Sequence, residues 1–180
     1  MNTVGNKGSV AVSLKIHETR ICFVCSHFAA DTERVIKRNS DYLNTKQRLR
    51  FEYNANLDYY DLEKAHDLIF WFGDLNYRLD ASLGLVNAIN LINSSSCEEL
   101  LENDQLFNEK KKGIIFENYN EGKINFRPTY KYLLREDKYA RQDLIRSSLN
   151  PLELPCDRIA YTDRILWRSA PDLNVNYLFH

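Results

Sequence analysis

The feature that most constrains the fold is an apolar run at residues 68–72, LIFWF, which stops abruptly at Gly73 and Asp74. Five large apolar residues without a polar break are typical of a central strand that is buried on both faces. Glycine and aspartate are common turn residues, so the strand is expected to end here. Such a strand needs partner strands beside it and apolar layers on each side. The run therefore predicts that the chain folds around a sheet.

Four more segments are predicted to be strands. Residues 9–16 alternate between polar and apolar side chains, and residues 21–26 form a more buried strand. Residues 17–20 are expected to join these two strands as a hairpin. Near the end of the chain, residues 164–167 and 175–179 favour two final strands.

Two charged or amphipathic segments favour helices. Residues 31–51 are highly charged and predict a long surface helix, with Asp31 or Thr32 as its cap. Residues 81–112 also favour helix, and Ser96 followed by Glu99 resembles a capping box.

The remaining segments are less regular. Residues 124–132 are expected to be extended and interrupted by Pro128, while residues 133–157 are polar and favour loops. The mixture of strands and helices indicates a layered α/β or α+β fold. A length of 180 residues suits one domain or most of one.

The overall charge limits the classes of partner. The chain carries 24 basic and 25 acidic residues, a formal net charge of −1. This balance gives no broad basic footprint for nucleic acid, so any anion site must come from local clustering. The first five residues are polar and lack the apolar core of a signal peptide. We expect a protein that is soluble or at most peripheral to a membrane.

Cys22 and Cys25 form a C-x-x-C pair that could indicate zinc or redox chemistry. They lie inside an apolar strand, however, and residues three apart on a strand point to opposite faces. No second pair follows. We therefore interpret them as core thiols, which suits a reducing, cytoplasmic location.

Polar residues follow two of the predicted strands and are candidates for chemistry. His27 ends the strand at 21–26, where it could move a proton or bind a phosphoryl oxygen. Asp74 follows the central strand and could orient or deprotonate water. Asn76, two residues on, is expected to point the same way and to donate to a phosphate oxygen. Each has a plain structural alternative, a core histidine in the first case and a turn in the second.

Two further motifs carry cations. The stretch PTYKY at residues 128–132 places Lys131 between two tyrosines, which suits a phosphorylated polar ring. The alternative is an edge strand with a solvated lysine. The stretch GNKG at residues 5–8 offers an amide, an ammonium group and permissive backbone that could hold a phosphate.

Taken in order, these motifs resemble those of the inositol polyphosphate 5-phosphatase family, a branch of the endonuclease/exonuclease/phosphatase superfamily. GDLNYR at residues 73–78 and PTYKY at 128–132 match the family pattern letter for letter. RNSDY at 38–42 resembles its ERNxDY stretch, and LRF at 49–51 ends a run closest to synaptojanin-like and fungal members. The resemblance covers nearly the whole chain, from Gly5 onward.

The resemblance implies a DNase I-like fold, a four-layer α-β-β-α sandwich. It implies hydrolysis of the 5-phosphate from an inositol ring, either in phosphatidylinositol 4,5-bisphosphate or in a soluble inositol phosphate. It also implies Mg²⁺ as the cofactor. Asp74 matches the residue that activates water, Asn76 the partner that holds a phosphoryl oxygen, and His27 a contact to the scissile phosphate. Asn6 and Lys7 match the pair that shapes the floor of the phosphate site.

Four other residues gain expected roles in the same way. Asp163 matches an aspartate that orients a catalytic histidine from the family's last motif. Tyr130 and Lys131 match residues that grip the neighbouring 4-phosphate. Arg158 is the best candidate for an arginine in that grip, although a proline is deleted just after it and Tyr161 replaces the usual tryptophan.

Several family motifs are not found in these residues. The resemblance places an active-site asparagine and the principal Mg²⁺ ligand, a glutamate, upstream of Met1, and a Ser-Asp-His motif beyond His180. We therefore expect residues 1–180 to form a partial catalytic domain, incomplete in its fold, that turns over little substrate alone.

Two alternatives remain open. The chain could be a non-catalytic module that keeps phosphoinositide-binding loops without turnover. It could also be another hydrolase of the superfamily, such as a nuclease or sphingomyelinase, but PTYKY argues against that class.

Overall fold

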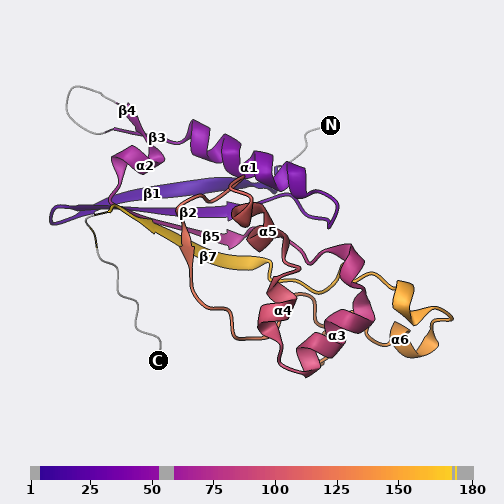
Figure 1. The fold of residues 1–180 in the computed structure, drawn as a ribbon. Coiled ribbons are helices and arrows are strands. Elements are labelled where there is room, and N and C mark those ends of the chain that lie inside the picture. Colours follow the sequence, from indigo (N-terminus) through magenta and orange to yellow (C-terminus); the bar gives the residue numbers. More distant parts are fainter. Residues whose placement is uncertain (1–4, 53–58, 172, 174–180) are drawn as a thin grey trace.

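The computed structural model describes residues 5–52, 59–171 and 173, which fold around one five-stranded sheet (Figure 1). The strands lie in the order β1-β2-β5-β7-β6. β1 and β2 form an antiparallel hairpin, β2 and β5 run parallel, and β7 runs antiparallel to β5 and β6. Their bounds are β1 Gly8–Ile16, β2 Thr19–His27, β5 Leu68–Asp74, β6 Asn120–Glu121 and β7 Asp163–Ser169. A separate two-stranded sheet is formed by β3 Arg50–Glu52 and β4 Tyr59–Asp61.

The large sheet confirms most of the strand predictions. The hairpin is present, but its turn is only His17 and Glu18 because Thr19 and Arg20 already pair with β1. β5 occupies the centre of the sheet, as its apolar sequence predicts. β7 contains the predicted strand at 164–167, whereas the one at 175–179 lies outside the described residues.

The helices fall into two groups (Figure 1). α1 and α2 lie over one face of the sheet together with α5, and α3, α4 and α6 form a lobe beyond the strand ends. The helix bounds are α1 Val35–Arg48, α2 Leu62–Ala65, α3 Leu85–Asn93, α4 Cys97–Leu101, α5 Gln105–Lys111 and α6 Leu144–Ser147, with 3₁₀ turns at Ala81–Leu83 and Pro151–Glu153. None of the described helices is long and apolar enough to span a bilayer.

α1 begins later than predicted, and the predicted caps are wrong. Asp31 has a φ of 76°, which a right-handed helix does not allow. The N-cap is Arg34, whose side chain makes no capping hydrogen bond. The helix is also less superficial than its charge suggests, because Tyr42 packs with its ring 4.9 Å from that of Trp71.

The helical prediction for residues 81–112 is confirmed as three short helices, but the capping box is wrong. Ser96 is the N-cap of α4, yet its side chain bonds Ser94 rather than the helix. Asp104 is the N-cap of α5 and does make a capping hydrogen bond, because its carboxylate accepts from the backbone N–H of Phe107.

The main core lies between the sheet and the first group of helices. Side chains from β2, β5 and β7 meet residues of α1, α2 and α5 there, with Trp71 fully buried at the centre. A second cluster, which includes Leu85 and Ile159, fills the lobe of α3 and α4. Burying large aromatic and aliphatic side chains of this kind supplies the main driving force for folding.

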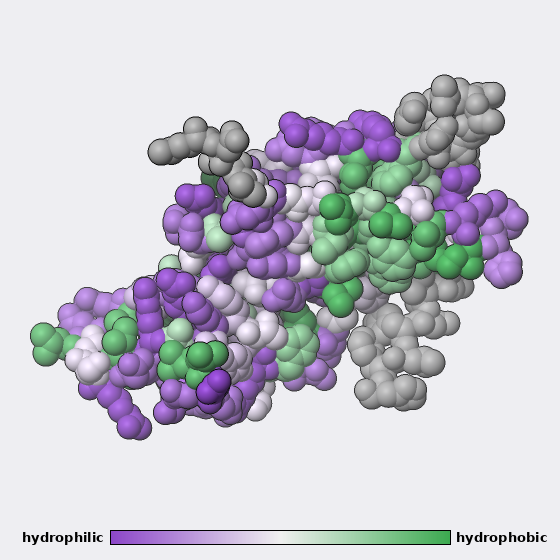
Figure 2. All heavy atoms as spheres, turned by 180° about the vertical axis from the view of Figure 1, so that it is seen from behind, coloured by the Kyte–Doolittle hydropathy of each residue, from purple (hydrophilic) through white to green (hydrophobic). Residues whose placement is uncertain are grey.

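The opposite face of the sheet is apolar but open. Val10 and Ile165 are 69% and 63% exposed, and Phe70 and Phe72 of β5 are only partly buried. Figure 2 shows hydrophobic residues gathered over this side of the sheet. Burial of β5 on both faces is therefore not seen among the described residues, which supply one of the two large sheets of the expected sandwich.

The segments after β6 are irregular, as predicted. Residues 124–132 are extended without forming a full strand, and Tyr130 makes an isolated antiparallel bridge to Ala160. The long stretch at 133–157 contains α6 and a 3₁₀ turn but is mostly loop. The bridge is important because it brings the PTYKY motif back to the start of β7.

Candidate functional site

Three predicted site residues form one row across the sheet. β2 and β5 are parallel and end together, so His27 pairs in register with Asp74. β7 runs the other way and starts at the same level, which places Asp163 opposite Asp74. Gly73 allows this arrangement, because a Cβ at this position would collide with the backbone carbonyl oxygen of Ser26. The strand-end reasoning from sequence is confirmed for His27 and Asp74, whereas Asp163 was expected at the site from the resemblance alone.

Two side chains of this row interact directly. His27 Nε2 lies 3.1 Å from Asp74 Oδ2, and the Lys7 ammonium contacts the same ring nitrogen. Burial raises the pKa of Asp74, and Asp163 adds to this, while His27, Lys7 and Arg78 act in the opposite direction. The other oxygen of Asp74, Oδ1, is buried and has no hydrogen-bond partner among the described residues. Asp74 therefore offers an unpaired carboxylate oxygen near the Lys7 ammonium group and the His27 ring.

Asn76 lies next to this row, but its geometry differs from the prediction. The sequence suggested that Asn76 follows the alternation of the strand and points the same way as Asp74. β5 ends at Asp74, and Asn76 adopts a left-handed φ of 58°. Its Nδ2 donates to the Phe28 carbonyl at 3.2 Å. An amide nitrogen carries two N–H bonds, so one stays available for a phosphoryl oxygen.

Arg78 belongs to the site and was given no role by the sequence reasoning. Its Nη2 donates to Asn76 Oδ1 at 2.7 Å and its Nε to the Asn76 carbonyl at 3.1 Å. Its guanidinium also lies 4.6 Å from the centre of the Tyr130 ring. The sequence did point to Arg78, because this residue ends the GDLNYR motif. The spacing of the motif could not show, however, which residues its long side chain contacts.

The residues expected to hold the 4-phosphate, Tyr130, Lys131 and Arg158, are brought together only in part. Arg158 Nη1 lies 3.5 Å from the Tyr130 hydroxyl, so the deletion after Arg158 does not separate them. Burial alone would raise the pKa of Tyr130, but Arg158 and Arg78 outweigh it and lower that pKa. Lys131 is tied to Arg158 through its backbone N–H, at 2.7 Å, and its side chain is exposed.

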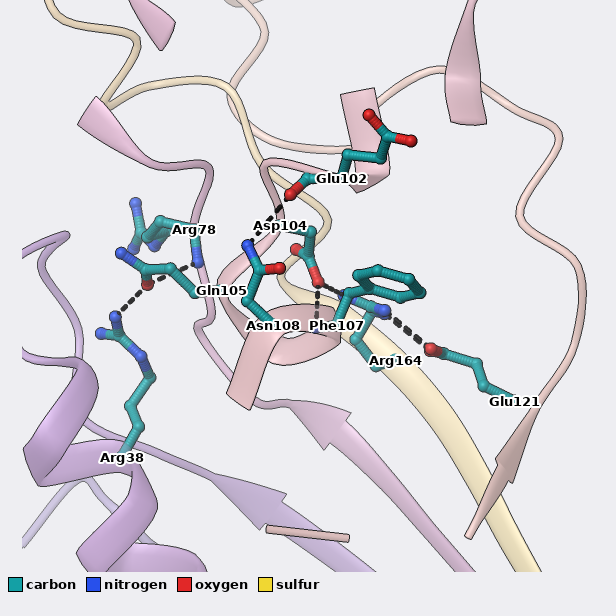
Figure 3. A network of polar contacts seen from close by, with 9 residues as sticks. All are labelled: Arg38, Arg78, Glu102, Asp104, Gln105, Phe107, Asn108, Glu121 and Arg164. Atoms are coloured by element: carbon teal, nitrogen blue, oxygen red, sulfur yellow. Dashed lines mark hydrogen bonds and ion pairs between the residues drawn. The ribbon is translucent and has the colours of Figure 1, made fainter. Parts of the chain in front are cut away.

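A second set of contacts holds the loop after β5 in place (Figure 3). Gln105, at the start of α5, accepts from the backbone N–H of Arg78 at 3.1 Å and from Arg38 of α1 at 2.5 Å. Its own amide donates to the Thr32 carbonyl at 3.0 Å. α1, α5 and the site loop are thereby locked to one another.

A buried ion network fixes the start of β7 (Figure 3). Arg164 bonds Asp104 at 2.8 Å and both carboxylate oxygens of Glu121, at 2.6 and 2.7 Å. Arg164 and Asp104 are almost fully buried, so each charge depends on its partner. This network anchors the residue that follows Asp163.

Two hollows adjoin the site. One, of about 750 Å³, is lined by Asn6, Lys7 and His27 together with polar residues of α1. The other, of about 770 Å³, is lined by Arg78, Tyr130 and Arg158 and by acidic residues, among them Asp80 and Asp157. The two hollows share Ala30 and Asp31, so they adjoin each other. Within the described ranges, Lys131 lines neither of them.

The residues at hand do not form a metal site by themselves. Across the described part of the chain, no group of three or more His, Cys, Asp or Glu side chains is placed to hold an ion. Asp74 and Asp163 are the acidic residues of the row, and two carboxylates fall short of the oxygen shell that Mg²⁺ requires. An ion bound here would need ligands beyond these two carboxylates.

Comparison with known proteins gives a consistent picture. Residues 1–179 match the family model described as endonuclease/exonuclease/phosphatase family 2. Human synaptojanin-1 is 40% identical over 179 residues, which is 95% of this chain and 10% of that protein. The type I inositol polyphosphate 5-phosphatase 2 of Arabidopsis thaliana is 39% identical over 163 residues, which is 89% of this chain and 25% of the relative. The chain thus spans a quarter or less of these two relatives.

Solved structures confirm the DNase I-like fold. The inositol polyphosphate 5-phosphatase domain of SPsynaptojanin, in complex with inositol (1,4)-bisphosphate and calcium ion, superposes with a TM-score of 0.73 and 34% identity over 93% of this chain and 44% of that one. A Cimex nitrophorin ferrous NO complex superposes with a TM-score of 0.62 and 26% identity over 92% of this chain and 49% of its own length. One fold thus carries very different ligands, so function must be argued from the site.

Proposed function

The chain belongs to endonuclease/exonuclease/phosphatase family 2, and we propose that it forms the substrate-binding and water-activating part of an inositol polyphosphate 5-phosphatase. The observation that carries the proposal is the row His27, Asp74 and Asp163, with His27 Nε2 3.1 Å from Asp74 Oδ2. It lies beside a separate cluster of Tyr130 and Arg158. The two clusters suit a ring with two phosphates, one to be cleaved and one to be held.

Each side chain has a chemical task in this proposal. Asp74 accepts a proton from water, and the water oxygen forms the new bond to phosphorus as the bond to the inositol oxygen breaks. The leaving inositol oxygen takes up a proton from solvent. The ammonium group of Lys7 offsets the negative charge that builds up on the transferred phosphoryl group, and the His27 ring contacts that group. The free N–H of Asn76 holds one phosphoryl oxygen. The products are inorganic phosphate and an inositol ring with a free 5-hydroxyl.

The second cluster, Tyr130 and Arg158, would bind the neighbouring phosphate. Arg158 offers a forked cation and Tyr130 a hydroxyl, a combination suited to phosphate. Lys131 is one residue away and exposed, so its ammonium group is free to reach an anion from the side. Recognition of a 4-phosphate by these three residues would favour rings phosphorylated at both positions 4 and 5.

We extend the proposal to the cofactor, the lipid form of the substrate and the location. Mg²⁺ would stabilise charge on the transferred group, and its main ligand would be the glutamate that the family pattern places outside these residues. The substrate would be phosphatidylinositol 4,5-bisphosphate or its soluble headgroup, met by a cytoplasmic protein that reaches membranes peripherally. The four free cysteines are compatible with a reducing compartment.

The proposal is tested by phosphate release from two substrates, inositol 1,4,5-trisphosphate in solution and phosphatidylinositol 4,5-bisphosphate in vesicles. The natural protein that contains this chain is assayed with Mg²⁺ and with a chelator, beside the isolated 180 residues. We expect Mg²⁺-dependent release by the former. Asp74→Asn should lower its kcat by about 10²- to 10⁴-fold, because the proton acceptor is lost while the shape is kept.

Three outcomes separate the alternatives. An unchanged kcat in Asp74→Asn would mean that water is activated elsewhere. Binding of both ligands without any release would favour the non-catalytic module. Release of nucleotides from DNA, with no release from inositol phosphates, would place the protein with the nucleases of the superfamily. The circular dichroism spectrum of Asp74→Asn serves as the control for folding.

A further inference from the structure

Arg78 is a buried cation whose side-chain hydrogen bonds reach no carboxylate among the described residues. Only 5% of its surface is exposed. These hydrogen bonds end on the carbonyl and amide oxygens of Asn76 and on the carbonyl of Asp157, at 2.7 to 3.3 Å. The Asp74 carboxyl is close enough for Arg78 to lower its pKa, but no hydrogen bond joins the two side chains in the described part of the chain. A buried charge without a directly bonded counter-ion is costly, so this site is suited to receive an anion.

The same side chain joins the two clusters of the site. One edge of its guanidinium holds the amide of Asn76, and its face stacks on the Tyr130 ring with a separation of 4.6 Å. Asn76 and Tyr130 are far apart in the sequence and belong to different segments. Arg78 lines the hollow of about 770 Å³ together with Tyr130 and Arg158, and the acidic residues Asp31, Glu33, Asp80 and Asp157 line it too. An anion held by the arginines and Tyr130 in this hollow would therefore act on a group that orients Asn76.

The backbone of Arg78 is held from the other side. Gln105 accepts from its N–H at 3.1 Å and is itself bonded to Arg38 of the long helix α1 (Figure 3). A change in the position of the Tyr130 ring can therefore reach Asn76 through the guanidinium while the backbone of the loop stays in place. A rigid support of this kind is what a positioning residue requires.

We propose that Arg78 is a positioning residue that couples occupation of the neighbouring-phosphate hollow to the orientation of the Asn76 amide. A phosphate at the adjacent ring position would then increase the rate of hydrolysis, in addition to increasing the affinity for the substrate. The substrate class is a ring with two adjacent phosphates. This inference rests on the proposed phosphatase function.

Two variants and a matched control test it. Arg78→Met removes both the positive charge and the paired N–H donors of the guanidinium. Arg78→Lys keeps the positive charge but not the paired donors. Arg141→Met is the control for the support of Asp157, whose carbonyl also accepts from Arg78. Arg141 bonds the Asp157 carboxylate at 3.0 Å and has no contact with Asn76 or Tyr130 among those seen in the described residues. The natural protein is assayed on two substrates, one phosphorylated at positions 4 and 5 and one at position 5 alone.

We expect the wild type and Arg141→Met to prefer the doubly phosphorylated ring. Arg78→Met should reduce that preference by roughly 10- to 100-fold, through kcat as well as KM. Arg78→Lys should recover part of the binding but little of the kcat, because an ammonium group cannot hold Asn76 and stack on Tyr130 together. An unchanged preference in Arg78→Met, at lower overall activity per folded molecule, would make Arg78 merely structural and overturn the proposal.

A second readout needs no turnover. The ionisation of Tyr130 can be followed by ¹³C NMR of labelled tyrosines, with Tyr130→Phe assigning its signal among the eleven tyrosines. Arg78 lowers the pKa of Tyr130, so Arg78→Met should raise it, while Arg141→Met should not. If no inositol phosphate is hydrolysed by the wild type, the proposed function fails. The titration of Tyr130 then tests the link between Arg78 and Tyr130 by itself. An unchanged pKa of Tyr130 in Arg78→Met would refute that link.

Discussion

Asp74 combines two properties that suit a proton acceptor. Burial raises the pKa of its carboxyl group, and its Oδ1 is left without a partner among the described residues. The nearby Lys7 and His27 keep the ionised form accessible. A carboxylate with these features binds a proton more readily than an exposed one.

The pH dependence of kcat/KM should follow Asp74. Activity needs its ionised form, so the rate should fall as pH falls through the raised pKa of Asp74. Asp163→Asn removes a neighbour that raises this pKa and should move the acid limb of the profile to lower pH. Lys7→Gln removes a neighbour that lowers it and should move the limb upward. Shifts of the same sign in both variants would show that another group sets the limb.

Single residues of the site were predictable where the backbone is regular. His27 and Asp74 end neighbouring strands, so their proximity followed from strand boundaries, whereas Asp163 was assigned only by resemblance. Asn76 was misplaced, because a left-handed turn breaks the alternation on which the prediction relied. Arg78 was missed, because its contacts depend on a long side chain rather than on its position in the chain.

At the scale of elements, the meeting of β2 and β5 positions the site. Ser26 pairs with Gly73, and these residues approach too closely for a side chain at position 73. Gly73 also has a φ of 125°, which residues with a side chain rarely adopt. The glycine of the GDLN stretch is thus required by the sheet itself, one residue before Asp74.

Gly73→Ala should therefore be strongly destabilising. We expect a loss of about 2–5 kcal/mol in the free energy of unfolding, from backbone strain together with the clash. Urea denaturation followed by circular dichroism measures this loss. Gly113→Ala is the control, because it shares a positive φ of 71° but would meet no atom within 4 Å. An equal loss in both variants would mean that strain alone, rather than close strand approach, explains the effect.

Helix boundaries were the weakest part of the element predictions. The charge pattern indicated α1 but could not show that Asp31 turns the chain away before the helix starts. The Ser96–Glu99 pair fitted a capping box by spacing, yet Ser96 finds a closer partner in Ser94. Capping depends on local competition for hydrogen bonds, which spacing does not reveal.

At the scale of the whole molecule, the sheet has one covered face and one open apolar face. The covered face carries the core, and the row of His27, Asp74 and Asp163 lies at the end of the open face, in register with its apolar rows. The chain spans 44% of the 5-phosphatase domain it superposes on. The sequence predicted a layered fold, but the apolar run could not tell whether both faces are covered by these residues.

The account depends most on the claim that one phosphorylated ring bridges the two clusters of the site. A crystal structure of the natural protein with inositol 1,4-bisphosphate tests this directly. The account predicts that the 4-phosphate bonds Tyr130 and Arg158 and that the 5-hydroxyl faces Asp74 and His27. A ring bound on the open apolar face, or turned with its 5-hydroxyl away from Asp74, would contradict it.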